Sequence, residues 1–143
     1  MSVMLLLAAL VCGPASAAQP KSLALLDFEL IDDMRAFSSE QARREVDRRL
    51  VLITTELAKE LESRGMYRVL DRDKAPGAER IALCWVQKVS NLILNINIEV
   101  RSVATGETVY AKSVDIRGNT DETWLRGVRR LVENIQERNQ HLR

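Results

Sequence analysis

The stretch from residue 87 to residue 116 constrains the fold of this chain more than any other part of the sequence. From residue 92 to residue 101, apolar and polar residues alternate, with Ile93 as the exception. Successive side chains of a β-strand point to opposite faces, so this alternation predicts a strand with one buried face. The expected buried side chains are Leu92, Leu94, Ile96, Ile98 and Val100, and the expected outward ones are Asn91, Asn95, Asn97, Glu99 and Arg101.

Two further strands complete an antiparallel meander around this one. Residues 104–107, A-T-G-E, predict a turn whose glycine can adopt a positive φ, and residues 108–116 run back beside the first strand. On the other side, residues 81–87 form a strand and residues 88–91 form the turn, because one continuous strand across both segments would be unusually long.

A long amphipathic helix is predicted in the amino-terminal half. Ser38 and Gln41 have the spacing of a capping box, and Gly65 is placed to end the helix with a left-handed residue. Between them, apolar residues recur at steps of three and four, which is typical of a helix with one buried face. These residues are Ala42, Val46, Leu50, Ile53, Leu57 and Leu61.

Strands flank this helix on both sides in the sequence. Residues 22–30 are apolar on both faces at their start, as expected for a central strand, and a loop follows at 31–37. Residues 66–70 form the second strand. A strand, a helix and a strand this close together favour a right-handed parallel crossover.

A second helix follows the meander. Asn119 and Thr120 are its candidate caps, and its apolar face comprises Trp124, Val128, Leu131 and Ile135. Residues 71–80 are polar and predict a turn. The predicted fold is α/β, specifically an α+β arrangement of two main helices on a five-stranded mixed sheet. It forms a single domain at residues 22–136, with a polar tail at 137–143.

Residues 1–18 have the pattern of a cleaved export signal. An apolar run at 3–11 is followed by a Gly-Pro break and an Ala-Ser-Ala motif, so cleavage is expected near Ala17/Ala18. The run is far shorter than the roughly twenty residues that span a bilayer. No Lys or Arg precedes it, so the alternative that Met1 is not the true start stays open. Acylation of Cys12 is a second alternative.

Charge and cysteine content narrow the classes of partner. The chain carries 21 basic and 20 acidic residues, and this balance argues against nucleic acid or an anionic membrane as partner. After cleavage Cys84 is the sole cysteine, which excludes an internal disulfide.

Two sets of motifs carry a resemblance to known families. The segments L-A-L-L-D-F-E-L at 23–30 and Y-R-V-L-D-R at 67–72, with the A-T-G-E turn, resemble the amino-terminal domain of TolB and the periplasmic domain of the CsgG secretion family. The segments V-Q-K-V-S-N-L-I-L-N-I-N at 86–97 and I-R-G-N-T-D-E-T-W at 116–124 are similar to a family of small secreted bacterial proteins of unknown function. This resemblance implies the fold and export, and it implies no catalytic residue.

The residues themselves do not indicate an enzyme. The one histidine, His141, lies in the predicted tail, and Cys84 lies between Leu83 and Trp85 in a strand, as expected for an inert buried thiol. Acidic residues at 27–33 have oxygen ligands for a hard cation, but solvated surface is the preferred interpretation. We therefore predict no catalytic residue, no metal and no cofactor.

Amide side chains are the candidate binding groups. Asparagine is disfavoured in strands, yet the strand around residues 95–97 contains two, and more amides lie nearby. The candidates are Gln87, Asn91, Asn95 and Asn97, together with Asn119 and Asp121 in the loop before the second helix. Such groups can read a peptide, a glycan or a partner strand. The alternative is that they bond across the sheet to Ser113 and Asp115 or face water.

Two functional hypotheses follow. The preferred one is an exported periplasmic accessory domain without enzymatic activity, which binds a protein of the cell envelope. The alternative is a small-ligand carrier that uses a concavity between sheet and helices, with Trp85 or Trp124 at its wall. The sequence leaves the partner, the pathway and the oligomeric state open.

Overall fold

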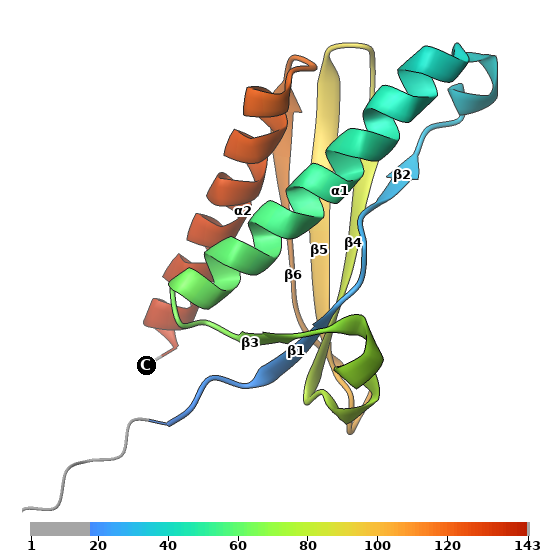
Figure 1. The fold of residues 1–143 in the computed structure, drawn as a ribbon. Coiled ribbons are helices and arrows are strands. Elements are labelled where there is room, and N and C mark those ends of the chain that lie inside the picture. Colours follow the sequence, from blue (N-terminus) through green and yellow to red (C-terminus); the bar gives the residue numbers. More distant parts are fainter. Residues whose placement is uncertain (1–17, 143) are drawn as a thin grey trace, which may run out of the picture.

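The computed structural model describes residues 18–142, so residues 1–17 of the predicted export signal, with Met1 and Cys12, lie outside the described residues. Two long helices pack side by side on one face of a mixed sheet (Figure 1). The elements in chain order are β1 Ser22–Leu25, β2 Glu29–Ile31, η1 Arg35–Phe37, α1 Glu40–Ser63, β3 Arg68–Leu70, η2 Arg72–Gly77, β4 Arg80–Lys88, β5 Ile93–Ser102, β6 Thr108–Arg117 and α2 Asp121–His141.

The sheet has the order β3-β1-β4-β5-β6, and β2 pairs with β4 beyond the end of β1. β1 is parallel to β3 and to β4, whereas β4, β5 and β6 are antiparallel neighbours. The predicted strand-helix-strand unit, the meander and the α+β class with two helices on a mixed sheet are confirmed. The sheet has six strands instead of the expected five.

The alternation in β5 sets the two faces of the sheet. The side chains that point toward the helices are almost fully buried, and they are Leu94, Ile96, Ile98 and Val100. Asn95 and Asn97 lie on the opposite face, as predicted. Leu92 is an exception, because it lies in the turn before β5 and is 68% exposed.

The predicted strand at residues 22–30 is wrong, since it is two strands separated by a break. Leu25 pairs with Ala82, and Glu29 pairs with Trp85. The chain therefore advances by four residues from β1 to β2 while β4 advances by three. The extra residue changes the phase of the alternation and buries Phe28 in the core. The amide N–H of Phe28 leaves the ladder and donates to the Thr54 hydroxyl of α1 at 3.1 Å.

The ends of α1 fit the sequence with one correction. The N-cap is Ser39, whose hydroxyl accepts from the Ala42 N–H at 3.2 Å, so the capping box predicted at Ser38 is wrong by one residue. At the other end, Gly65 has a φ of 64°, as expected for a left-handed C-cap. The turn predicted at 71–80 contains a short 3-10 helix, η2.

α2 begins as predicted and ends later. Thr120 is its N-cap and accepts from the Thr123 N–H at 3.2 Å. The helix continues to His141, past the residue at which the sequence predicted a polar tail. Arg138 stabilises this last part, because its guanidinium lies 4.9 Å from the Tyr110 ring centroid and donates to the Val109 carbonyl at 3.1 Å.

Neither helix in residues 18–142 has the length and apolarity that crossing a membrane requires.

Candidate functional site

Three of the predicted binding residues share the face of the sheet that the helices leave uncovered. We call this surface the open face, and it comprises the outward side chains of β2, β4, β5 and β6. Gln87 pairs with Asn95, and Trp85 pairs with Asn97, across β4 and β5. Gln87, Asn95 and Asn97 therefore form one group.

The two strand asparagines are bonded within the sheet. Asn95 Nδ2 donates to Asp115 Oδ1 at 2.8 Å, which is one of the cross-strand bonds expected under the alternative interpretation. Asn97 is 9% exposed, and its Nδ2 donates to the Asn95 backbone carbonyl at 3.1 Å. Both amides are therefore held in fixed orientations, whereas Gln87 is exposed.

Trp85 was one candidate for the wall of a concavity between sheet and helices, but it lies on the other side of the sheet, on the open face. Sequence reasoning missed the apolar part of this face. Leu83 and Trp85 of β4 are half-buried there, and with Ile31 of β2 they line a shallow depression. Ile31 is 47% exposed. The signal was present, because residues 81–86 are an apolar run on both faces of the strand while the helices cover only one of them.

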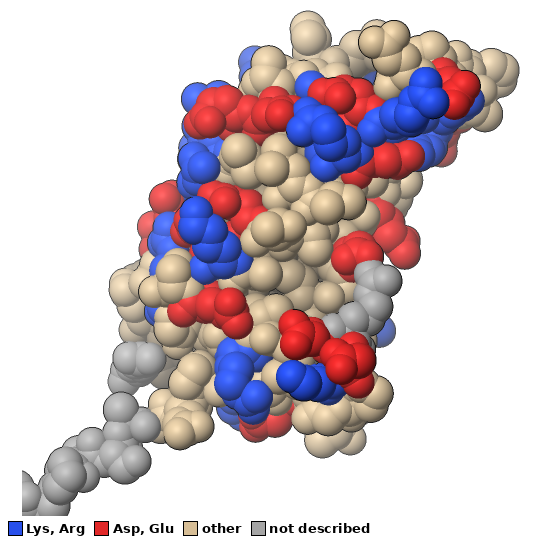
Figure 2. All heavy atoms as spheres, viewed as in Figure 1, with Lys and Arg blue, Asp and Glu red and all other residues tan. Residues whose placement is uncertain are grey.

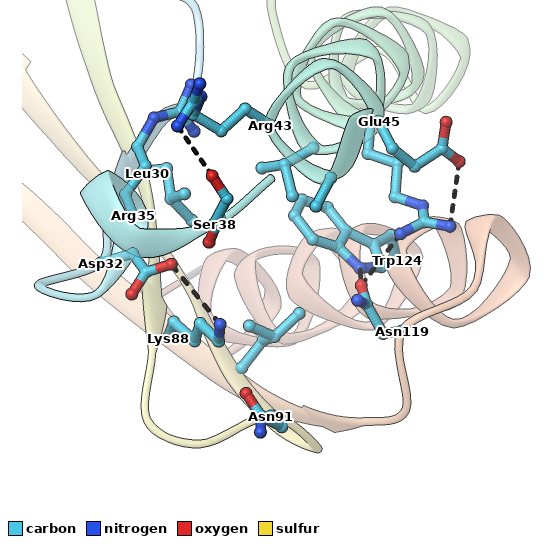
Figure 3. A pocket seen from close by; sticks show the side chains of 14 residues that line it. Leu30, Asp32, Arg35, Ser38, Arg43, Glu45, Lys88, Asn91, Asn119 and Trp124 are labelled. Atoms are coloured by element: carbon cyan, nitrogen blue, oxygen red, sulfur yellow. Dashed lines mark hydrogen bonds and ion pairs between the residues drawn. The ribbon is translucent and has the colours of Figure 1, made fainter. Parts of the chain in front are cut away.

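The remaining predicted residues lie on the helix side, near a cavity of about 240 Å³ that we call the α1 cavity. It lies beneath the amino-terminal part of α1 (Figure 3). Asn91 and Asn119 line it, and Asp121 lies beside it at the start of α2. The six predicted residues are thus divided between the two sides of the sheet.

The inner wall of the α1 cavity is apolar. It is formed by Leu30, Ala42, Val46, Leu94 and Trp124. Trp124 Nε1 donates to Asn119 Oδ1 at 3.1 Å, and this bond fixes the orientation of the indole ring. The role of Asn119 is therefore to position Trp124 and, as described next, an arginine.

Charged side chains surround the apolar wall. Arg35, Arg43, Arg49 and Lys88 contribute positive charge, and Asp32 and Glu45 contribute negative charge. Figure 3 places Asp32, Arg35 and Lys88 on the side of the cavity away from Trp124 and Asn119. Bases thus outnumber acids among the charged residues that line the cavity.

Arg49 is the most constrained of these bases. Its guanidinium donates to Asp121 Oδ1 at 2.8 Å and to Asn119 Oδ1 at 3.0 Å, and it lies 3.1 Å from Glu45 Oε1. Hydrogen bonds from Arg48 and Arg49 lower the pKa of Asp121 to about 2. Asp121 therefore links α2 to α1 in the structure.

The other charges of α1 are mostly paired along the helix. Arg44 lies 2.7 Å from Glu40, and Arg48 lies 2.7 Å from Glu45, whose pKa its hydrogen bond lowers. Figure 2 shows acidic and basic side chains interleaved along this helix. Arg43 differs, because its Nη1 donates to the Ser38 carbonyl at 2.8 Å and no carboxylate of residues 18–142 pairs with it.

The two groups considered for catalysis, Cys84 and His141, are far apart in the sequence and differ in exposure, although Cys84 borders the depression of the open face. Cys84 points into the core, and burial raises the pKa of its thiol. His141 is exposed at the end of α2. In the described part of the chain, no cluster of three or more His, Cys, Asp or Glu side chains is arranged to hold a metal ion.

We compared the chain with protein-family models, with curated proteins and with solved structures. A family model described as a protein of unknown function (DUF2380) matches residues 73–135, from η2 into α2. This confirms the resemblance to a family of unknown function. No curated protein matches the sequence.

Two solved structures show the same fold. The PelC dodecamer from Paraburkholderia phytofirmans has a TM-score of 0.55 at 11% identity, over 81% of this chain and 89% of that one. Protein XCC0632 from Xanthomonas campestris has a TM-score of 0.52 at 8% identity, over 86% of this chain and 85% of that one. At these identities the likeness concerns the fold alone.

Proposed function

We propose that this chain is an exported accessory domain of the cell envelope that binds a partner protein through the open face of its sheet. The observation that carries the proposal is the one-sided cover of the sheet. Both helices pack on one face, and the other face presents half-buried apolar side chains of β4 beside a row of amides. The proposed role is binding rather than catalysis.

The composition of the open face suits a protein partner. Specific interfaces have an apolar centre that contains aromatic residues and a polar rim that carries hydrogen bonds. Leu83, Trp85 and Ile31 supply the apolar part, and Gln87 supplies an exposed amide at its border. We expect a partner surface with an apolar projection at its centre and hydrogen-bonding groups around it.

The bonded asparagines support this role. Asn95 and Asn97 are already fixed by hydrogen bonds within the sheet. Binding of a partner therefore costs little additional side-chain conformational entropy at these two residues. The remaining amide oxygen of the half-buried Asn95 and the exposed Gln87 can still accept bonds from a partner. The similar PelC structure is a dodecamer, so a domain of this fold can use its surfaces for protein contacts.

The export part of the proposal is supported by the signal pattern in residues 1–18. Fractionation of cells that express the full chain tests it, with the intact mass of the exported protein. We expect a periplasmic protein cleaved near Ala17/Ala18. A cytoplasmic protein of uncleaved mass contradicts export, and an acylated product that begins at Cys12 contradicts this cleavage site.

The partner is tested by site-specific photocrosslinking in cells. A photoreactive residue is placed at Gln87 on the open face and, as control, at Thr55 on the exposed side of α1. Ile31→Glu is then added to disrupt the open face, with Val51→Glu as its matched control on α1, where Val51 is 68% exposed.

We expect a discrete adduct from the Gln87 position that is absent from the Thr55 position. Ile31→Glu should abolish this adduct, and Val51→Glu should leave it unchanged. Both substitutions are at exposed sites, and the urea unfolding curve of each purified variant verifies folding. An adduct that survives Ile31→Glu, or one that both positions give equally, contradicts the proposed interface.

A further inference from the structure

We propose that the α1 cavity binds a small amphipathic anion, with Arg43 and Lys88 holding a carboxylate or phosphate group and the apolar side chains that line the cavity contacting a short apolar tail. The proposal is independent of the open face, because the cavity lies on the other side of the sheet.

The cavity results from the way the two helices overlap. Ion pairs and hydrogen bonds join Arg49 to Asp121, Glu56 to Arg129 and Arg64 to Gln136, in step along both helices. α2 thus accompanies α1 only from Arg49 onward, and the first turns of α1 extend beyond the start of α2. The space beneath them is closed by β2, η1 and the turn between β4 and β5.

The wall of the cavity favours an apolar group. Leu30, Ala42 and Val46 expose apolar surface to it, and the almost fully buried Leu94 and Trp124 complete the wall. A mostly apolar wall with a few polar groups is typical of sites for small molecules. The volume of about 240 Å³ lies just below the roughly 300 to 1,000 Å³ of sites for drug-sized ligands. A short tail is therefore expected.

The charges favour an anion. Arg44, Arg48 and Arg49 each have a carboxylate within 3.1 Å, whereas Arg43 lines the cavity with only the Ser38 carbonyl as partner within residues 18–142. A guanidinium has five donors and can hold a carboxylate or a phosphate by two parallel bonds. Arg43 therefore retains donors for a ligand.

Lys88 is the second anchor. Its ammonium lies 3.5 Å from Asp32 Oδ2, longer than the roughly 2.7–2.9 Å of a charge-assisted hydrogen bond. Lys88 therefore keeps part of its capacity to attract an anion bound in the same cavity.

Tryptophan fluorescence of the full chain tests the proposal. Trp85→Phe leaves Trp124 as the single tryptophan, so the signal reports on the cavity wall alone. The probes are octanoate, octyl phosphate and 1-octanol, which share one tail and differ in the headgroup. Isothermal titration calorimetry gives the dissociation constants.

We expect octanoate, octyl phosphate or both to shift the Trp124 emission and to bind at least about tenfold more tightly than 1-octanol. Tighter binding of octanoate identifies a carboxylate site, and tighter binding of octyl phosphate identifies a phosphate site. Equal binding of all three probes, or no binding of any, overturns the proposal.

Matched variants assign the headgroup contact. Arg43→Met removes the guanidinium and keeps an apolar stem, and it should weaken binding of the anion by about tenfold or more. Arg44→Met removes an arginine that is paired with Glu40 on the exposed side of α1, and it should leave binding unchanged. Equal affinities of the two variants overturn the role of Arg43. Ile31→Glu should bind the anion normally, so failure of the open face and failure of the cavity are distinguishable.

Discussion

Replacing Gly127 by alanine should loosen the packing of α2 on the sheet. Gly127 is buried on the side of α2 that faces β5 and β6. A Cβ atom at this position would lie 2.5 Å from Ile116 Cγ2 and 2.8 Å from Ile96 Cδ1. Carbon atoms in contact prefer about 3.5 to 4.0 Å, so both approaches are repulsive.

The magnitude depends on two opposing effects. Overpacking of a core costs about 1–3 kcal/mol, and we expect the upper value, because the closest atom, Ile116 Cγ2, is on a β-branched side chain with restricted χ1. Alanine is favoured over glycine in a helix by about 1 kcal/mol. The difference is a net loss of about 2 kcal/mol for Gly127→Ala.

Urea unfolding measures this loss. Gly77→Ala is the matched control, since no heavy atom lies within 4 Å of the point that its added Cβ would occupy, and we expect a change within about 1 kcal/mol. Ile96→Val removes the Cδ1 atom, so the double variant with Gly127→Ala should lose less stability than the sum of the two single variants. A gain of about 1 kcal/mol for Gly127→Ala alone, as helix propensity predicts, refutes the steric argument.

Three further predictions concern single groups. Thr54→Val removes the acceptor of the Phe28 N–H and should lower the free energy of unfolding by about 1–3 kcal/mol, whereas Thr55→Val, on the exposed side of α1, should change it less. The pKa of Asp121 is lowered in the folded state to about 2, so its contribution to stability is complete above its unfolded pKa of 3.8 and is lost as the pH falls toward 2. Asp121→Asn should flatten the stability profile in that pH window, and an unchanged slope would argue against the link between the helices. The Cys84 thiol should react with Ellman's reagent only in urea, because burial raises its pKa, and rapid labelling of the folded protein is the contrary result.

The sequence predicted the elements whose pattern is local. In β5, the period of two assigned Leu94 and Ile96 to the core and Asn95 and Asn97 to the other face, because strand geometry alone fixes that alternation. The cap of α2 at Thr120 was also predictable, since an N-cap bonds within its own first turn.

The break between β1 and β2 could not be read from the residues. An uninterrupted strand that buries Leu23 and Leu25 would also turn Asp27 toward the core. The chain instead inserts one residue and buries Phe28. That solution depends on the Thr54 hydroxyl, which is distant in the sequence and accepts the bond that the strand gives up.

The candidate site was predictable only in part. The position of the amides in β5 followed from the pattern, but their bonds to Asp115 and to the backbone are tertiary details. The sequence pattern does not separate Arg43 from the neighbouring arginines that are paired along α1. Arg43 differs from Arg49 because α2 begins near Arg49, and this offset between the two helices exists only in the folded chain.

Strand β4 takes part in both proposed surfaces. Adjacent residues of a strand face opposite sides, so Gln87 belongs to the open face while Lys88 lines the α1 cavity. A backbone shift at this end of β4 that repositions one of these side chains also moves the other. If such a shift accompanies binding of a partner, it also alters the affinity for the anion, and thermodynamic linkage then requires the anion to alter the affinity for the partner by the same factor.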